Sequence, residues 1–101
     1  MTRNVARMRR KLTRRGRKAL HSAHVLDEVV DSEVRLVPGL AGDARRRAVD
    51  HLAELVLLSQ AYRHYSYGWI SRRELERRGK GALGRLESLS ASGLEQLTER
   101  E

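Results

Sequence analysis

The sequence predicts an all-α protein, in which a long antiparallel helical hairpin is followed by two or three shorter helices. Three observations favour this fold class. Apolar residues recur at spacings of three and four through two long segments, and no stretch alternates apolar and polar residues over the length of a strand. The chain also contains one Ile and no Phe, residue types that are enriched in strands. At 101 residues the chain is expected to form a single domain.

A basic N-terminal arm precedes the hairpin. Residues 1–18 contain nine Lys or Arg and no Asp or Glu, whereas residues 19–101 contain twelve bases and thirteen acids and form the predicted helical domain. So dense a cluster of positive charge repels itself unless an anion lies against it, so the arm predicts a polyanionic partner. The bases of the arm are Arg3, Arg7, Arg9, Arg10, Lys11, Arg14, Arg15, Arg17 and Lys18.

The hairpin is predicted from two amphipathic segments separated by a short loop. Residues 19–37 form the first helix, which Pro38 and Gly39 are expected to end. Asp43 is predicted to be the N-cap of the second helix, which runs from about Ala44 to about Tyr65. The inner stripe expected for this second helix is Ala48, Leu52, Leu55, Val56, Ser59 and Tyr62.

The C-terminal half is predicted to contain shorter helices. Ser71 and Glu74 have the spacing of a capping box, and Gly79 is expected to end the helix that they begin. Further helical segments are expected over Ala82–Ser90 and Leu94–Arg100. Helix, glycine turn and helix in this order is typical of a helix-turn-helix DNA reader. The basic residues that would contact DNA are Arg72, Arg73, Arg77, Arg78, Lys80 and Arg85.

All four aromatic residues lie within eight positions, Tyr62, Tyr65, Tyr67 and Trp69. In one interpretation they are structural: Tyr62 faces the core and Trp69 anchors the third helix onto the hairpin. In the other, Tyr65, Tyr67 and Trp69 stack on nucleic-acid bases, with Tyr65 and Tyr67 the more exposed members. A patch of this kind would also suit a homodimer interface.

Several kinds of chemistry are not expected. Residues 79–84 match G-x-G-x-x-G but follow a helix, so no dinucleotide site is predicted. His21, His24 and Glu28 share a helix face without a facing ligand cluster, and Cys is absent, so we predict no metal and no cofactor. The spacing of Arg46 and His51 resembles that of helical ribonucleases of the HEPN kind, a two-residue signal that arises readily in an Arg-rich helix. The longest apolar run is Leu55–Leu58, too short to span a membrane.

The sequence therefore predicts a non-enzymatic nucleic-acid-binding protein, with duplex DNA favoured over RNA. The arm would neutralise phosphates, and the basic C-terminal half would position the complex. One alternative is an RNA-binding or ribonucleoprotein subunit, and another is a helical module that docks an acidic protein partner. A homodimer, or a place in a larger assembly, is expected because the core is thin. The expected location is cytoplasmic, associated with the nucleoid if DNA is the partner.

Overall fold

The computed structural model describes residues 13–99, with side chains described through residue 91. Over this part of the chain the protein is all-helical, which confirms the predicted fold class. The elements are α2 (Arg14–Val34), a short 3₁₀ helix η1 (Val37–Gly39), α3 (Gly42–Ser66) and α4 (Arg72–Glu99). None of these helices is long and apolar enough to cross a lipid bilayer.

The first helix begins earlier than the periodicity predicts. Thr13 is the N-cap of α2, and its Oγ1 accepts a hydrogen bond from the amide of Gly16 at 2.9 Å. The predicted boundary between arm and domain, after residue 18, therefore falls inside α2. Residues 14–18 of the predicted arm are the first turns of a helix that continues to Val34.

The start of α3 also differs from the prediction. The N-cap is Ala41, which supplies no side-chain hydrogen bond, and Asp43 lies in the first turn instead of capping it. Gly42 has a positive φ of 59°, a conformation that glycine adopts without the strain a side chain would add. Asp43 lies in the first turn of α3, where a negative charge interacts favourably with the positive end of the helix dipole.

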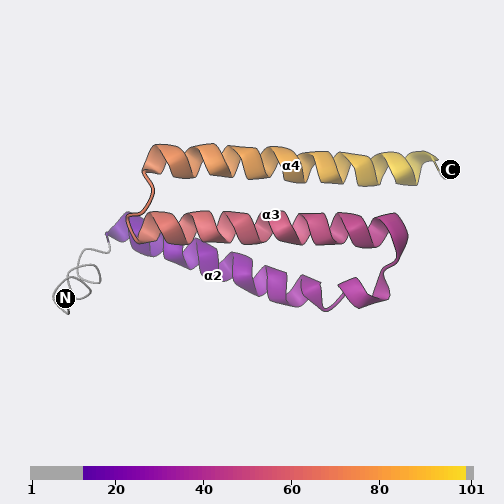
Figure 1. Cartoon of the computed structure of the whole chain (residues 1–101), viewed down its shortest axis with the longest axis horizontal. Helices are drawn as coiled ribbons and strands as arrows, with labels where there is room; N and C mark the ends of the chain where they lie inside the picture. Colours follow the sequence, from indigo (N-terminus) through magenta and orange to yellow (C-terminus); the bar gives the residue numbers. More distant parts are fainter. Residues whose placement is uncertain (1–12, 100–101) are drawn as a thin grey trace.

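The three long helices are arranged with α3 in the middle, and α2 and α4 each pack against it (Figure 1). The contacts between α2 and α3 pair Ala23 with Ser59 and Glu33 with His51, so the two helices run in opposite directions. After the turn at residues 67–71 the chain reverses again, and α4 runs alongside α3 (Figure 1). The starts of α2 and α4 and the end of α3 consequently lie at the same end of the molecule.

The core is built largely from small residues. Ser59 and Ala23 are almost fully buried where α2 and α3 meet, and Leu52 and Leu55 are buried as the inner stripe predicts. Val56, placed in the same stripe by the sequence, is 40% exposed, so that assignment is wrong. The buried apolar residues in the described part of the chain are Ala19, Ala23, Leu52, Leu55, Ala61 and Ala82.

The C-terminal half is one helix, not two or three. α4 runs without interruption through Gly79, Gly81 and Gly84, so the turn expected at Gly79 and the helix-turn-helix built on it are absent. Each glycine costs a helix about 1 kcal/mol relative to alanine. Here the packing of α4 along α3, which buries Ala82 and half-buries Leu75 and Leu86, outweighs that local cost.

This continuity predicts that alanine will stabilise the protein at Gly79 and Gly84. A Cβ built at either position meets nothing within 4 Å, and neither has a positive φ. We expect each substitution to raise the free energy of unfolding by about 0.5–1 kcal/mol, measured by urea denaturation. Gly68→Ala is the opposite control, because Gly68 has a φ of 79° and alanine there will destabilise. A loss of stability in Gly79→Ala and Gly84→Ala would contradict a continuous helix.

Candidate nucleic-acid interface

Four predicted binding residues lie on the first turns of α2. Arg14, Arg15, Arg17 and Lys18 are all exposed, while Gly16 between them is buried. None of the four forms an ion pair with another residue of the described part of the chain. Their charges are therefore available to a ligand.

The start of α4 adds to the positive charge of the same end. Arg72 and Arg73 begin this helix, and its first turn lies next to the end of α3 (Figure 1). Because the N-terminus of a helix carries about half a positive charge, the starts of α2 and α4 both attract anions. Side chains already accept hydrogen bonds from some of the free backbone amides at each terminus. Thr13 caps α2, and Ser71 Oγ accepts a hydrogen bond from the Glu74 amide at 3.1 Å. We call this the basic end, defined by Arg14, Arg15, Arg17, Lys18, Arg72 and Arg73.

A pocket of about 370 Å³ brings residues of all three long helices together at the basic end. Arg15 and Lys18 line it from α2, Tyr65 from α3 and Arg72 from α4. Four predicted site residues that are far apart in the sequence therefore share one concave surface. Glu76 also lines the pocket, and its carboxylate lies 3.3 Å from Arg72 Nε, so it offsets part of the positive charge.

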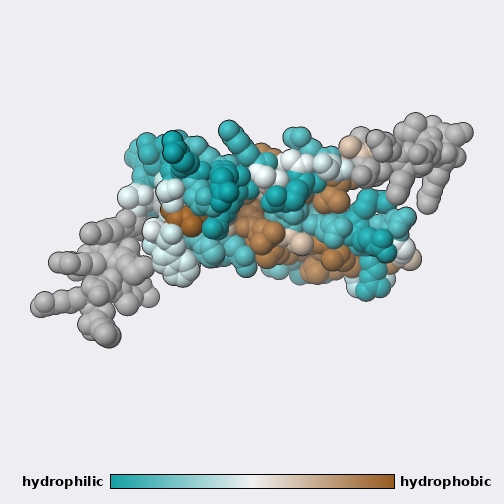
Figure 2. Space-filling view, turned by 45° about the horizontal axis from the view of Figure 1, so that its top comes forward, coloured by the Kyte–Doolittle hydropathy of each residue, from teal (hydrophilic) through white to brown (hydrophobic). Residues whose placement is uncertain are grey.

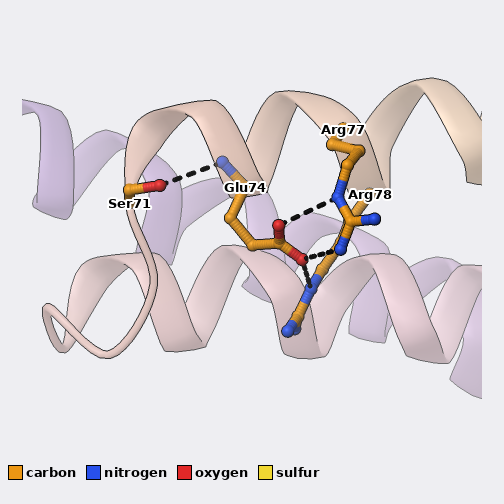
Figure 3. Close-up of polar contacts among 4 residues, drawn as sticks. All are labelled: Ser71, Glu74, Arg77 and Arg78. Carbon is orange, nitrogen blue, oxygen red and sulfur yellow. Dashed lines mark hydrogen bonds and ion pairs between the residues drawn. The ribbon is translucent and has the colours of Figure 1, made fainter.

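The next bases along α4 are neutralised within the helix. Arg77 donates two hydrogen bonds to the Glu74 carboxylate, at 2.6 and 2.9 Å, and Arg78 donates a third at 3.0 Å (Figure 3). The hydrogen bonds from Arg77 and Arg78 lower the pKa of Glu74 from 4.5 to about 2. The carboxylate stays charged at any physiological pH and competes with a phosphate for both guanidinium groups.

The remaining predicted residues of α4 fall into two groups. Arg85 donates to Glu54 of α3 at 2.8 Å and so joins α4 to α3. Arg73 and Lys80 form no ion pair with a described residue, and both are exposed. Of the bases predicted on α4, four are thus already paired with acids. The spacings of three and four between Glu74 and its arginines are visible in the sequence and could have identified this pairing.

The aromatic cluster is more exposed than the structural interpretation predicts. Trp69 is 64% exposed and Tyr67 42% exposed, so Trp69 does not anchor α4 onto the hairpin. Tyr65, expected to be exposed, is half-buried, as is Tyr62. The rings of Tyr67 and His64 lie 5.2 and 5.3 Å from the ring of Trp69. Trp69 thus adds an exposed indole to the connection between α3 and α4. This connection lies at the same end of the molecule as the start of α2 (Figure 1).

A polar contact that the sequence did not indicate joins α2 to α3. Ser59, only 2% exposed, donates to Asp27 Oδ1 at 2.6 Å and accepts from Arg63 Nη1 at 2.9 Å. Arg63 also pairs with the Asp27 carboxylate, and these hydrogen bonds from Arg63 and Ser59 lower the pKa of Asp27. Arg63 is consequently held by Asp27 within the bundle and does not belong to the unpaired bases of the basic end.

Some predicted site residues lie outside the described residues, namely Arg3, Arg7, Arg9, Arg10 and Lys11. Within the described part, no three His, Asp or Glu residues gather as ligands for a metal ion, and this includes His21, His24 and Glu28. His51 Nε2 lies 3.5 Å from Oε2 of Glu33 on α2.

No known protein family, curated protein or solved structure matches this chain, so its function is inferred from its own residues.

Proposed function

We propose that the protein is a non-enzymatic nucleic-acid-binding protein that engages phosphates through its basic end, with duplex DNA as the preferred partner. The observation that carries this proposal is that the bases at the start of α2 are unpaired among the described residues, whereas most of the predicted bases of α4 form ion pairs. The four bases at the start of α2 have no acidic partner among the described residues, whereas Arg72, Arg77, Arg78 and Arg85 of α4 are paired. In this proposal α2 supplies the affinity, and the neutral body of the bundle stays off the DNA.

Duplex DNA is favoured because of its charge density. It carries one negative charge per ~1.7 Å of axis, so a compact cluster of arginines can reach several phosphates at once. Arginine also suits phosphate oxygens through its planar, forked donors, and three of the four bases at the start of α2 are arginine. The nine bases of residues 1–18 set the upper limit of this electrostatic contribution. A place on the nucleoid follows if DNA is the partner.

An RNA or single-stranded partner is the second candidate, and the exposure of Trp69 favours it. An indole that is 64% exposed, at the same end of the molecule as a cluster of bases, can stack on an unpaired base. Tyr67, which packs against Trp69, would widen the stacking surface. Duplex DNA keeps its bases stacked on one another and would leave this surface unused.

The test is a salt titration of the full chain binding to duplex DNA, single-stranded DNA and a structured RNA, followed by fluorescence anisotropy. For duplex DNA we expect the logarithm of the binding constant to fall with the logarithm of salt concentration with a slope of about −4 to −6. A tighter complex with single-stranded DNA or RNA, with a shallower slope, would favour the second candidate. Polyglutamate serves as a control for general attraction to polyanions. Absence of binding to all three nucleic acids at about 0.1 M salt would overturn the proposal.

A further inference from the structure

The groove between α3 and α4 contains a cavity that the proposed function does not use. Its volume is about 460 Å³, which is within the range of sites for small molecules. Its polar lining consists of Gln60 and His64 from α3 and of Arg77, Arg78 and Arg85 from α4. No Asp or Glu is among the described residues that line it. The polar part of this cavity therefore favours a ligand that carries negative charge.

The same cavity has an apolar wall. Leu57 and Leu58 line it from α3, and Ala82 lines it from α4. Ala82 is buried and Leu58 is half-buried, so packing of the two helices fixes part of this wall. Figure 2 shows hydrophobic surface in the middle of the molecule, bordered by hydrophilic side chains. Apolar side chains with a few polar groups on one side are the usual lining of a site for an organic molecule.

The arginines of the cavity are paired with acids, but the pairing does not use all of their N–H groups. Arg78 donates to Glu74 through Nε, and Arg85 donates to Glu54 through Nε. A guanidinium group has five N–H donors, so the Nη groups of Arg78 and Arg85 take no part in these two ion pairs. Arg78 also extends from α4 toward α3 (Figure 3). Two guanidinium groups at the cavity can therefore still donate to an anion that enters it.

The paired acids hold these guanidinium groups in place. The side chains of Glu74 and Glu54 are only 27% and 14% exposed, so they are themselves partly fixed by packing. An arginine that is already held loses less conformational freedom when a ligand binds. The three arginines of the cavity and these two carboxylates together leave one positive charge. This balance matches a ligand with a single negative charge, whereas it attracts a distant polyanion only weakly.

Gly81 leaves room for the guanidinium group of Arg85. A Cβ at position 81 would lie 3.1 Å from Nη1 and 3.5 Å from Nη2 of Arg85. Both Nη atoms therefore lie against the part of α4 that lines the cavity, because Gly81 and Arg85 are both lining residues. Gly79 and Gly84 have no such neighbour within 4 Å. Among these three glycines of α4, the missing side chain at position 81 is the one that admits the guanidinium group.

We propose that this cavity binds a small organic monoanion, a carboxylic acid with a compact apolar body. The carboxylate accepts hydrogen bonds from the Nη groups of Arg78 and Arg85, whose planar forks match its two oxygens. The apolar body packs against Leu57, Leu58 and Ala82. None of the described residues that line this cavity lines the pocket at the basic end. The inference is therefore independent of nucleic-acid binding.

The probe for the test is 1-naphthoate, which combines one carboxylate with an apolar body of two rings. It is titrated into the full chain, and the chemical shifts of the backbone amides are followed by NMR. We expect a Kd on the order of 1 mM, with shifts at the amides of Gly81 and Ala82 and none at Gly16 of the basic end. Acetate has only the charge and naphthalenemethanol only the apolar body, so each is expected to bind at least about tenfold more weakly.

Arg85→Gln and Arg72→Gln form a matched pair of variants. Both arginines lie on α4, both pair with a glutamate through Nε, and their side chains are 56% and 60% exposed. Arg85 lines the cavity and Arg72 does not. We expect Arg85→Gln to weaken the binding of 1-naphthoate at least about tenfold, and Arg72→Gln to change it by less than about twofold. Equal effects of the two substitutions would contradict the proposal.

A second pair of variants covers the case in which Arg85→Gln disturbs the packing of α4. Gly81→Leu places a side chain in the cavity and displaces the Arg85 guanidinium, whereas Gly79→Leu adds the same side chain where a Cβ meets nothing within 4 Å. We expect Gly81→Leu to abolish the binding of 1-naphthoate and Gly79→Leu to leave it unchanged. Circular dichroism verifies that both variants keep their helices.

Three results would overturn the proposal. They are no binding of 1-naphthoate to the unaltered chain, shifts confined to the amides of the basic end, and equal affinity of Gly81→Leu and Gly79→Leu for the probe. The titrations contain no nucleic acid, so they are separate from the test of the proposed function. Failure to bind DNA, with binding of 1-naphthoate intact, would contradict only the proposed function.

Discussion

Replacement of Arg14, Arg15, Arg17 and Lys18 by glutamine will weaken the binding of duplex DNA by up to about 10³-fold at 0.1 M salt. Each phosphate contact contributes about 0.9 to the slope of the salt dependence, so four lost contacts will reduce the slope by about 3 to 4. Glutamine is a good helix former, and all four side chains are exposed, so α2 is expected to remain intact. The measurement is the salt titration described for the proposed function.

Two double variants provide a matched control for this prediction. Arg14→Gln with Arg17→Gln and Arg77→Gln with Arg78→Gln each remove two positive charges from the chain. The first pair is unpaired, whereas the second is bound to Glu74. We expect the first variant to reduce the slope by about 2 and the second by less than 1. Equal reductions would show that only net charge matters, and the basic end would then have no special role.

Ser59→Leu will lower the free energy of unfolding by about 3 kcal/mol. Ser59 is 2% exposed and faces Ala23, which is fully buried, so a larger side chain forces α2 and α3 apart. The substitution also removes the hydroxyl that donates to Asp27 and accepts from Arg63. In thermal denaturation at a fixed protein concentration, the expected decrease in Tm is roughly 10–20 °C.

Two further substitutions separate the causes of that loss. Ser59→Ala removes the hydrogen bonds without adding volume and is expected to cost about 1 kcal/mol. Ser88→Leu makes the same chemical change at an exposed position of α4 and is expected to change stability by less than about 0.5 kcal/mol. If Ser59→Leu were as stable as the unaltered chain, the close approach of α2 and α3 at Ala23 would be wrong.

The helical class and the inner stripe were predictable because they follow from local periodicity. Leu52, Leu55 and Ser59 are buried as their spacing indicates, and Ser71 caps α4 as its spacing from Glu74 indicates. The capping box is completed only in part, because the Glu74 carboxylate binds Arg77 and Arg78. Local signals of this kind act within a few residues and need no knowledge of the rest of the fold.

The predictions that the structure contradicts concern properties that depend on residues far apart in the sequence. Gly79 was expected to end a helix, but packing of α4 along α3 outweighs the local cost of a glycine. Val56 was placed in the core because α3 has apolar residues on more than one side, and periodicity alone does not show which side a neighbour covers. Arg85 and Glu54 are 31 positions apart, so their ion pair could not be found before the fold was known.

The exposed indole at the turn between α3 and α4 gives the protein an intrinsic fluorescent reporter. Trp69 is the chain's only tryptophan, and it lies at the basic end with Tyr67 and His64 as ring neighbours. Its tryptophan emission therefore comes from one known position in the chain. A ligand that covers this turn will change the polarity around the indole, so occupancy of the basic end can be followed in the unlabelled protein.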